Sequence, residues 1–199
     1  MTTWVGTIGV VTLACGLVGC KDPPKAPPIS RYEAVKAPAA SVARWCDDTF
    51  SGSSPRLTLP PLAAPLAGRA QAALPAGKRV WVNLWATWCG PCLREMPLLL
   101  KWQDDLRKDG VDIDVVLLSL DDNAGAVQKL LGERKDLAAA KVARVLSQSA
   151  YEEWLESYVK DPSTPIPLHL LASADGSVRC LRAGSLRESD YPAAKAVFR

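Results

Sequence analysis

A pair of cysteines at the junction of a strand-like run and a helical pattern constrains this chain more than any other feature. Residues 80–85 are almost all apolar and predict a buried strand. The sequence Trp-Cys-Gly-Pro-Cys follows after two residues, and a helical pattern begins there. Two cysteines at this spacing can close a small disulfide ring, and the helix dipole favours the thiolate form of the first, Cys89. The junction therefore predicts a redox dithiol, Cys89 and Cys92, at the N-terminus of a helix.

Composition places the chain among soluble globular proteins. Its 199 residues fit one domain with a modest appendage, and 48% of them are hydrophobic against 23% charged. The net charge of +3 is too small to indicate binding to nucleic acid. We therefore expect one hydrophobic core and no nucleic-acid partner.

The N-terminal residues predict export. Residues 4–18 are apolar and uncharged, which is short for a membrane span and suits the core of a signal peptide. The stretch ends in Leu-Val-Gly-Cys at residues 17–20, which resembles the bacterial lipobox, in which Cys20 would be acylated. Residues 1–3 lack the usual lysine or arginine, so a buried helix or an uncleaved anchor stays open. We expect residues 1–20 to be a lipoprotein signal peptide.

Proline content separates a tether from the folded domain. Residues 21–30 hold four of the sixteen prolines, and paired prolines favour an extended backbone. Residues 51–55 form a turn-rich break. We expect residues 21–55 to be a proline-rich tether and N-terminal extension, with the folded domain spanning residues 56–199.

The rest of the chain alternates strand and helix patterns. Residues 112–120 predict a second buried strand, and Asn123 can cap the helix after it. Ser149 and Glu152 have capping-box spacing ahead of an apolar, aromatic stripe, which indicates another helix. Four further elements are expected: a short strand or an extended link at 141–146, strands at 168–172 and 177–182 joined by a two-residue Asp175-Gly176 turn, and a closing helix at 189–198.

The strand before the dithiol, the terminal hairpin and Pro97, which should kink the first helix, together resemble the thioredoxin superfamily over residues 56–199. Residues 83–97 are similar to the TlpA/ResA group of membrane-tethered bacterial thiol-disulfide oxidoreductases. The resemblance implies an α/β fold, a thioredoxin-like three-layer sandwich with a mixed central sheet and helices on both faces. Asn83 stands where thioredoxin itself has a buried acid.

The resemblance also assigns roles to the residues of the dithiol helix. Cys89 is the attacking thiol and Cys92 the resolving thiol. Glu95 lies one helical turn beyond Cys92, and a glutamate at this place is part of the active site in the TlpA/ResA group. Burial would raise its pKa and let it exchange a proton with Cys92. The alternative is a solvated glutamate that the helix dipole stabilises.

A substrate groove beside the dithiol is implied in the same way. Its residues are Trp88, Gly90, Pro91, Ile166 and Pro167, and the superfamily places a cis-proline at Pro167, facing the dithiol. The assignment of the cis bond depends on the resemblance, because a cis bond is uncommon even before proline.

Two features near that groove leave alternatives open. Thr164-Pro165 competes for the cis-proline position. Members of the group commonly continue with two threonines, whereas this chain has Leu168 and His169. His169 is the only histidine, and it either tunes the active site or serves as a hydrogen-bonded filler on a strand.

Cys46 and Cys180 lie outside the dithiol motif. In an oxidising compartment they could form a structural disulfide that ties the N-terminal extension to the terminal hairpin. Independent free thiols are the alternative.

The predicted function is that of an extracytoplasmic thiol-disulfide oxidoreductase that reduces protein disulfides. The expected location is the bacterial cell envelope, facing the periplasm and anchored to a membrane by lipid. Protein thiols and disulfides are the expected substrates, with a membrane electron donor. We expect no cofactor and no resident metal: two cysteines are half of a zinc site, and no second pair or histidine cluster completes it. A module that binds or delivers Cu(I) through the dithiol is the alternative of another class.

Overall fold

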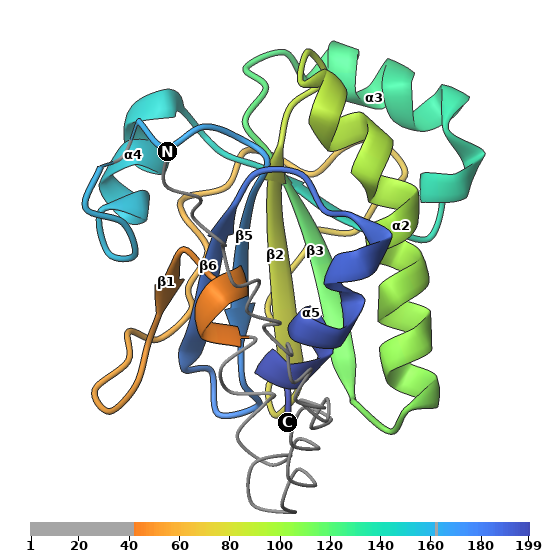
Figure 1. Cartoon of the computed structure of the whole chain (residues 1–199). Coiled ribbons are helices and arrows are strands. Elements are labelled where there is room, and N and C mark those ends of the chain that lie inside the picture. Colours follow the sequence, from red (N-terminus) through yellow and green to blue (C-terminus); the bar gives the residue numbers. More distant parts are fainter. Residues whose placement is uncertain (1–41, 162) are drawn as a thin grey trace, which may run out of the picture.

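Six strands form one mixed sheet in the computed structural model, which describes residues 42–161 and 163–199 (Figure 1). Their order across the sheet is β1-β6-β5-β2-β3-β4. Three neighbouring strands are parallel: β2 (Arg79–Trp85), β3 (Ile113–Ser119) and β4 (Lys141–Arg144). The other three are antiparallel to their neighbours: β5 (Leu168–Ala172), β6 (Val178–Ala183) and β1 (Asp48–Thr49).

Strand β2 is the central strand that carries the dithiol. Its apolar run is buried from Val80 to Trp85 because it is paired on both sides, in parallel with β3 and antiparallel with β5. The strand ends four residues before Cys89. A central strand that is paired on both sides therefore fixes the position of the cysteine pair.

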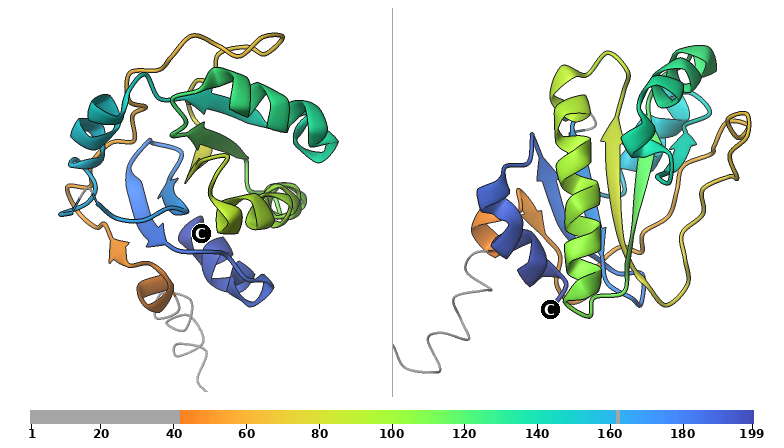
Figure 2. Two further views of the ribbon diagram at one scale, coloured as in Figure 1. Left: turned by 90° about the horizontal axis from the view of Figure 1, so that it is seen from above. Right: turned by 90° about the vertical axis from the view of Figure 1, so that its right-hand side faces the viewer.

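Helices cover both faces of the sheet (Figure 2). Helices α2 (Gly90–Lys108), α3 (Ala124–Glu133) and α5 (Tyr191–Val197) share one hydrophobic core with Trp81. Helix α4 (Gln148–Leu155) packs on the other face, in a core that includes Leu57. The three-layer α/β sandwich with a mixed sheet is thus confirmed.

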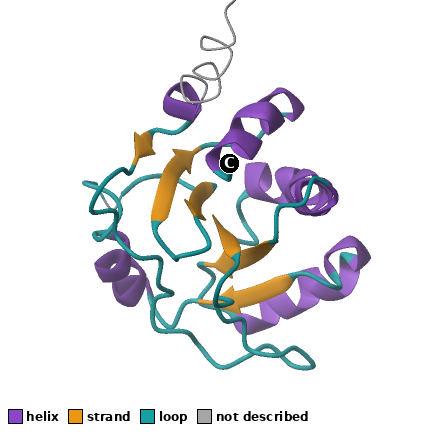
Figure 3. Ribbon diagram, turned by 90° about the horizontal axis from the view of Figure 1, so that it is seen from below, coloured by secondary structure: helices purple, strands orange, loops and turns teal. Residues whose placement is uncertain are grey.

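The segment from residue 42 to 55 lies against the sheet. A helical turn at residues 42–45 precedes β1, and the two lie beside β6 in the view from below (Figure 3). Trp45 packs edge-on against Trp81 at a centroid distance of 6.1 Å. The sheet therefore draws on residues ahead of Arg56, where the folded domain was expected to begin. The predicted signal peptide with Cys20, and the tether up to residue 41, lie outside the described residues.

Two local sequence predictions are wrong in detail. The N-cap of α4 is Ser147, whose hydroxyl accepts from the Ala150 N–H, and the predicted cap Ser149 lies inside the helix. The β5–β6 connection is longer than a two-residue turn, because the Ser173 N–H bonds to the Ser177 carbonyl across three residues. Gly176 takes φ 85° within that connection, a conformation that favours glycine.

Within the part of the chain that the structure describes, no helix has both the length and the apolar character needed to cross a membrane.

Candidate active site

The two cysteines of the motif lie at the N-terminus of α2. Cys89 is the N-cap, with extended backbone angles, and its Sγ accepts from the Cys92 N–H at 3.3 Å. The structure joins Cys89 and Cys92 by a disulfide with a Cα–Cα distance of 5.3 Å. A sulfur at this cap position receives the free N–H groups and the positive end of the helix dipole. On reduction, the arrangement favours negative charge on Cys89.

Exposure separates the two sulfurs. Cys89 is 5% exposed and Cys92 is fully buried, while the neighbouring Trp88 is 72% exposed. An incoming disulfide therefore reaches Cys89 first, and Cys92 is placed to react only with its neighbour.

A loop from the other side of the sheet faces Cys89. The peptide bond between Ile166 and Pro167 is cis, and the Ile166 carbonyl oxygen lies 3.9 Å from the Cys89 Sγ. The competing bond, Thr164-Pro165, is not among the cis bonds of the described residues. The loop before β5 thus brings backbone groups to the dithiol, where an extended substrate segment could pair with them.

Gly90 and Pro91 fit the first turn of α2. A Cβ at position 90 would lie 3.3 Å from the Nη1 of Arg94, which is tighter than ordinary contact. Proline is tolerated at position 91 because the N–H it lacks has no partner in the first turn of a helix. The spacer is therefore compact, and Cys89, the less buried of the two cysteines, lies next to the exposed Trp88.

A cavity of about 570 Å³ opens beside the dithiol. Trp88 and Ile166, both predicted groove residues, line it together with Tyr151 and Glu152 of α4. The structure thus brings Trp88 and Ile166 to one cavity and adds one face of α4, whereas Gly90, Pro91 and Pro167 of the predicted groove do not line it. The aromatic stripe of that helix also packs into the core, as Tyr151 is only 3% exposed.

Glu95 is buried beneath the dithiol, with 3% of its surface exposed. Its Oε1 accepts from the Asn83 Nδ2 at 2.9 Å, and its Oε2 accepts from the Leu186 N–H at 2.8 Å. Burial raises the pKa of Glu95 to about 7, against the lowering effect of these two hydrogen bonds and of the Arg182 charge. The solvated alternative is therefore wrong, and the carboxyl group can gain or lose a proton near neutral pH.

His169 lies in the same buried layer. It is fully buried, and its Nδ1 is 3.2 Å from the Trp81 Nε1. Burial lowers the pKa of His169 to about 3; the Arg182 charge adds to this effect, and a backbone hydrogen bond with Gly184 opposes it. The imidazole is therefore neutral at physiological pH, so it does not act as a pH switch there.

One supporting contact was missed in the sequence. The Asp121 carboxylate accepts from both the N–H and the hydroxyl of Thr87, and from the Ser119 hydroxyl. These bonds fasten the link between β2 and the dithiol to the end of β3. An acidic residue directly after a buried strand was the available signal.

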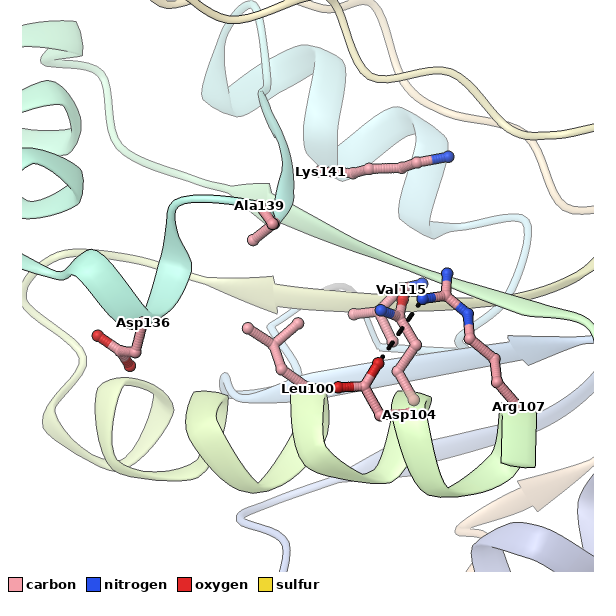
Figure 4. Close-up of a pocket in the computed structure, with 9 residues that line it drawn as sticks. Leu100, Asp104, Arg107, Val115, Asp136, Ala139 and Lys141 are labelled. Carbon is pink, nitrogen blue, oxygen red and sulfur yellow. Dashed lines mark hydrogen bonds and ion pairs between the residues drawn. The ribbon is translucent and has the colours of Figure 1, made fainter. Parts of the chain in front are cut away.

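A second cavity lies along the C-terminal half of α2, away from the dithiol at its N-terminus (Figure 4). Its volume is about 240 Å³, and Asp104, Arg107 and Lys141 line it. Both cations are already paired with the buried carboxylate of Asp114, at 2.7 Å and 2.6 Å. Both cations of this cavity therefore already have a carboxylate partner.

No group of three or more histidine, cysteine, aspartate or glutamate side chains that could hold a metal ion occurs within residues 42–161 and 163–199.

Fold and site together define a class. A mixed sheet between helical layers, a cysteine pair at the helix that follows the central strand, and a cis-proline loop opposite that pair are the marks of a thioredoxin-superfamily dithiol protein. The chain belongs to the Redoxin family, whose pattern it matches over residues 52–194. The curated proteins that it resembles include several relatives from the group of thiol-disulfide oxidoreductases named ResA.

Two of those relatives are proteins named thiol-disulfide oxidoreductase ResA. The one from Oceanobacillus iheyensis is 40% identical over 57 residues, or 29% of each chain. The one from Geobacillus kaustophilus is 29% identical over 114 residues, which are 57% of this chain and 59% of the relative. The chain thus matches less than two thirds of the length of either relative.

Solved structures support the fold. A thiol-disulfide isomerase from Corynebacterium glutamicum has a TM-score of 0.54 at 17% identity, covering 72% of this chain and 94% of the other. A thioredoxin-family thiol:disulfide interchange protein from Chlorobium tepidum has a TM-score of 0.50 at 21% identity, covering 61% and 81%.

Proposed function

We propose that this protein is an extracytoplasmic thiol-disulfide oxidoreductase that reduces disulfides of other proteins. The observation that carries the proposal is the Cys89–Cys92 disulfide at the N-terminus of α2, with the buried acid Glu95 one turn further along the helix. The names of the ResA relatives support the same reaction class.

The first step uses Cys89 in the reduced protein. Its thiolate attacks one sulfur of the substrate disulfide, and a mixed disulfide forms while the other substrate sulfur leaves as a thiolate and takes a proton from solvent. The cap position stabilises the attacking thiolate, and the Ile166 carbonyl and the exposed Trp88 surround it.

The second step uses Cys92 and Glu95. Cys92 is buried, so its thiol needs a nearby base to lose its proton, and the ionised carboxylate of Glu95 can accept it. The Cys92 thiolate then attacks the Cys89 sulfur and closes the Cys89–Cys92 disulfide, while the second substrate sulfur leaves as a thiolate and takes a proton from solvent. The substrate gains two electrons and the protein loses two.

The direction of exchange is part of the proposal. The Gly90-Pro91 spacer is the one found in thioredoxin, whose reduction potential of roughly −270 mV makes it a reductant. A redox titration of the Cys89/Cys92 couple should therefore give a potential near the reducing end of the family range. A value near roughly −120 mV, at the oxidising end, would reverse the assigned direction.

The setting of the enzyme is also proposed. We place it in the bacterial cell envelope, facing the periplasm and held on a membrane by acylation of Cys20, with a membrane protein as electron donor. The lipobox-like sequence supports the anchor. The Cys46–Cys180 disulfide supports an oxidising compartment, since such bonds are rare in the cytosol.

A turnover assay tests the reaction. Reduced protein should cleave the disulfides of a protein substrate such as insulin, and Cys89→Ser should abolish the activity because it removes the nucleophile. The proposal is overturned if the wild-type protein is no faster than an equal concentration of free dithiol, or if Cys89→Ser retains its rate.

Copper binding through the same dithiol is the alternative of another class. The nearby Met96 is fully buried in the core, so it is poorly placed to act as a third soft ligand. Metal analysis of the reduced protein, purified with Cu(I) present, separates the two functions: stoichiometric copper without turnover would favour the alternative.

A further inference from the structure

His169 and Glu95 meet in the buried layer under the dithiol. On the sheet, His169 of β5 stands opposite Asn83 of β2, so their side chains lie on the same face. The His169 Nε2 is 3.3 Å from the Glu95 Oε1, and both side chains are at most 1% exposed. The contact joins a neutral imidazole to the acid and is therefore not an ion pair at neutral pH.

The other ring nitrogen decides which nitrogen of His169 carries the proton. The Trp81 Nε1 is only a donor, and it points at the His169 Nδ1 from 3.2 Å. The amide nitrogen of Asn83, which also donates to Glu95, lies 3.3 Å from the same Nδ1. A nitrogen approached by two donors is an acceptor, so in the neutral ring the proton sits on Nε2. The N–H of His169 therefore belongs to the atom nearest Glu95.

That N–H has no partner in regular geometry, although it is fully buried. Buried donors without an acceptor are rare and costly, because they have lost their bond to water. The nearest carboxylate oxygen is the Glu95 Oε1, at 3.3 Å, while the Gly184 backbone is the other acceptor that contacts the imidazole. The attraction of Oε1 for the N–H increases when the carboxyl group ionises. The His169 Nε2–H is thus placed to donate a hydrogen bond to the Glu95 carboxylate when that group is ionised.

We propose that His169 is a positioning residue, whose Nε2–H donates to the ionised Glu95 carboxylate and stabilises it. This ionised form of Glu95 is the one that accepts the proton of Cys92. The inference rests on the proposed dithiol reaction.

The other groups around Glu95 leave room for this effect. Strand β2 supplies the neutral amide of Asn83, and the loop after β6 supplies the Leu186 N–H. Arg182 of β6 is the one charged group that acts on the carboxyl. On the helix of Glu95 itself, Cys92 can titrate only in the reduced protein, because the disulfide removes its proton in the oxidised one. The pKa of Glu95 would therefore be set by three neutral donors, on Asn83, Leu186 and His169, and by the more distant cation of Arg182.

A pair of matched variants tests the proposal. In His169→Asn the side chain ends near the former Nδ1 and cannot reach Glu95, whereas in His169→Gln the amide nitrogen can occupy the former Nε2 position. We expect the Glu95 pKa, measured by carbon NMR of its carboxyl group in the oxidised protein, to rise by about one unit in His169→Asn. It should return close to the wild-type value in His169→Gln.

A measurement on the unaltered protein keeps the test independent of the stability of the variants. Nitrogen NMR of the imidazole should show Nδ1 without a proton and Nε2 with one, and the Nε2 signal should move with the titration midpoint of Glu95. An Nδ1–H tautomer, an Nε2 signal that ignores Glu95, or equal midpoints in His169→Asn and His169→Gln would overturn the inference. The oxidised protein has no free dithiol, so these results do not depend on turnover; failure of the insulin assay would instead overturn the proposed function.

Discussion

At the scale of single residues, the burial of Glu95 predicts how stability depends on pH. A carboxyl group whose pKa is raised by folding binds its proton more tightly in the native state, so stability falls as pH rises from the unfolded value to the folded one. For Glu95 this range runs from about 4.5 to about 7. The difference corresponds to roughly 3 kcal/mol across that range.

Glu95→Gln should remove this dependence. Relative to the wild type, the free energy of unfolding of the oxidised variant should increase by up to roughly 3 kcal/mol between pH 4.5 and pH 7, as measured by denaturant titrations. The comparison with the wild type is needed because the lowered pKa of His169 makes the free energy of unfolding rise with pH between about pH 3 and 6.5, opposite to the effect of Glu95. A pH-independent difference between the two proteins would contradict the buried, ionising Glu95.

The same substitution should slow the chemistry. Without a base beside it, Cys92 loses its proton less readily, so resolution of the mixed disulfide at pH 7 should slow by about 10²-fold in Glu95→Gln. A plot of this resolution rate against pH should also lose its inflection near pH 7. Stopped-flow measurements on the preformed mixed disulfide with a substrate follow this rate. Asp104→Asn, which changes an exposed acid on the same helix, is the control and should keep both features.

At the scale of elements, α2 runs through Pro97 although proline leaves a carbonyl without its helical partner. The orphan carbonyl is that of Leu93, four residues earlier, and the Arg134 Nη1 donates to it at 3.4 Å. The residue that ends α3 therefore replaces the bond missing from α2.

A double-mutant cycle tests this replacement. Arg134→Ala should destabilise the protein by about 1 kcal/mol, and the cost should shrink in the background of Pro97→Ala, whose N–H can bond to Leu93 again. Chemical denaturation gives the free energy of unfolding of the wild type, the two single variants and the double variant. Asp136→Ala controls for the loss of the Arg134–Asp136 ion pair, and equal costs of Arg134→Ala in the two backgrounds would rule the replacement out.

The elements that the sequence predicted are those whose signal is local. The runs that became β2 and β3 are continuously apolar, and Asn123 caps α3 as expected, accepting from the N–H groups of Gly125 and Ala126. Strand β1 was missed because it is two exposed residues long, and its pairing with β6 depends on partners more than 130 positions away. The cap of α4 was misplaced because two serines compete for it, and Glu152 bonds to the Gln148 side chain.

At the scale of the whole molecule, one covalent bond joins the N-terminal segment to the far end of the chain. The Cys46–Cys180 disulfide links residues 134 positions apart. The neighbouring Trp45 packs on Trp81 in the core that lies under α2, α3 and α5. A cross-link that closes so long a loop restricts the unfolded chain strongly.

Removing that bond should therefore be costly. The double variant Cys46→Ser/Cys180→Ser should lose about 2–5 kcal/mol of unfolding free energy in denaturant titrations under oxidising conditions. Cys89→Ser/Cys92→Ser is the matched control, because its bond spans only 3 positions and should contribute less. Equal losses in the two variants would contradict a loop-closure origin.

The candidate site could be predicted in part. The dithiol, Glu95 and the Ile166–Pro167 region were visible because the spacing and the family resemblance mark them. The contacts of His169 with Trp81 and Asn83 could not be predicted, because these residues are 88 and 86 positions away along the chain. Only the pairing of β2 with β5 brings them together. The role of His169 therefore had to come from the fold.

Trapping the mixed disulfide tests the central claim most directly. With an excess of a protein disulfide, Cys92→Ser should accumulate a covalent complex through Cys89, detected by mass spectrometry and dissolved by added dithiol, because the resolving sulfur is missing. Cys89→Ser should form none. A complex that forms equally through Cys92, or none with either variant, would contradict the account that Cys89 attacks and Cys92 resolves.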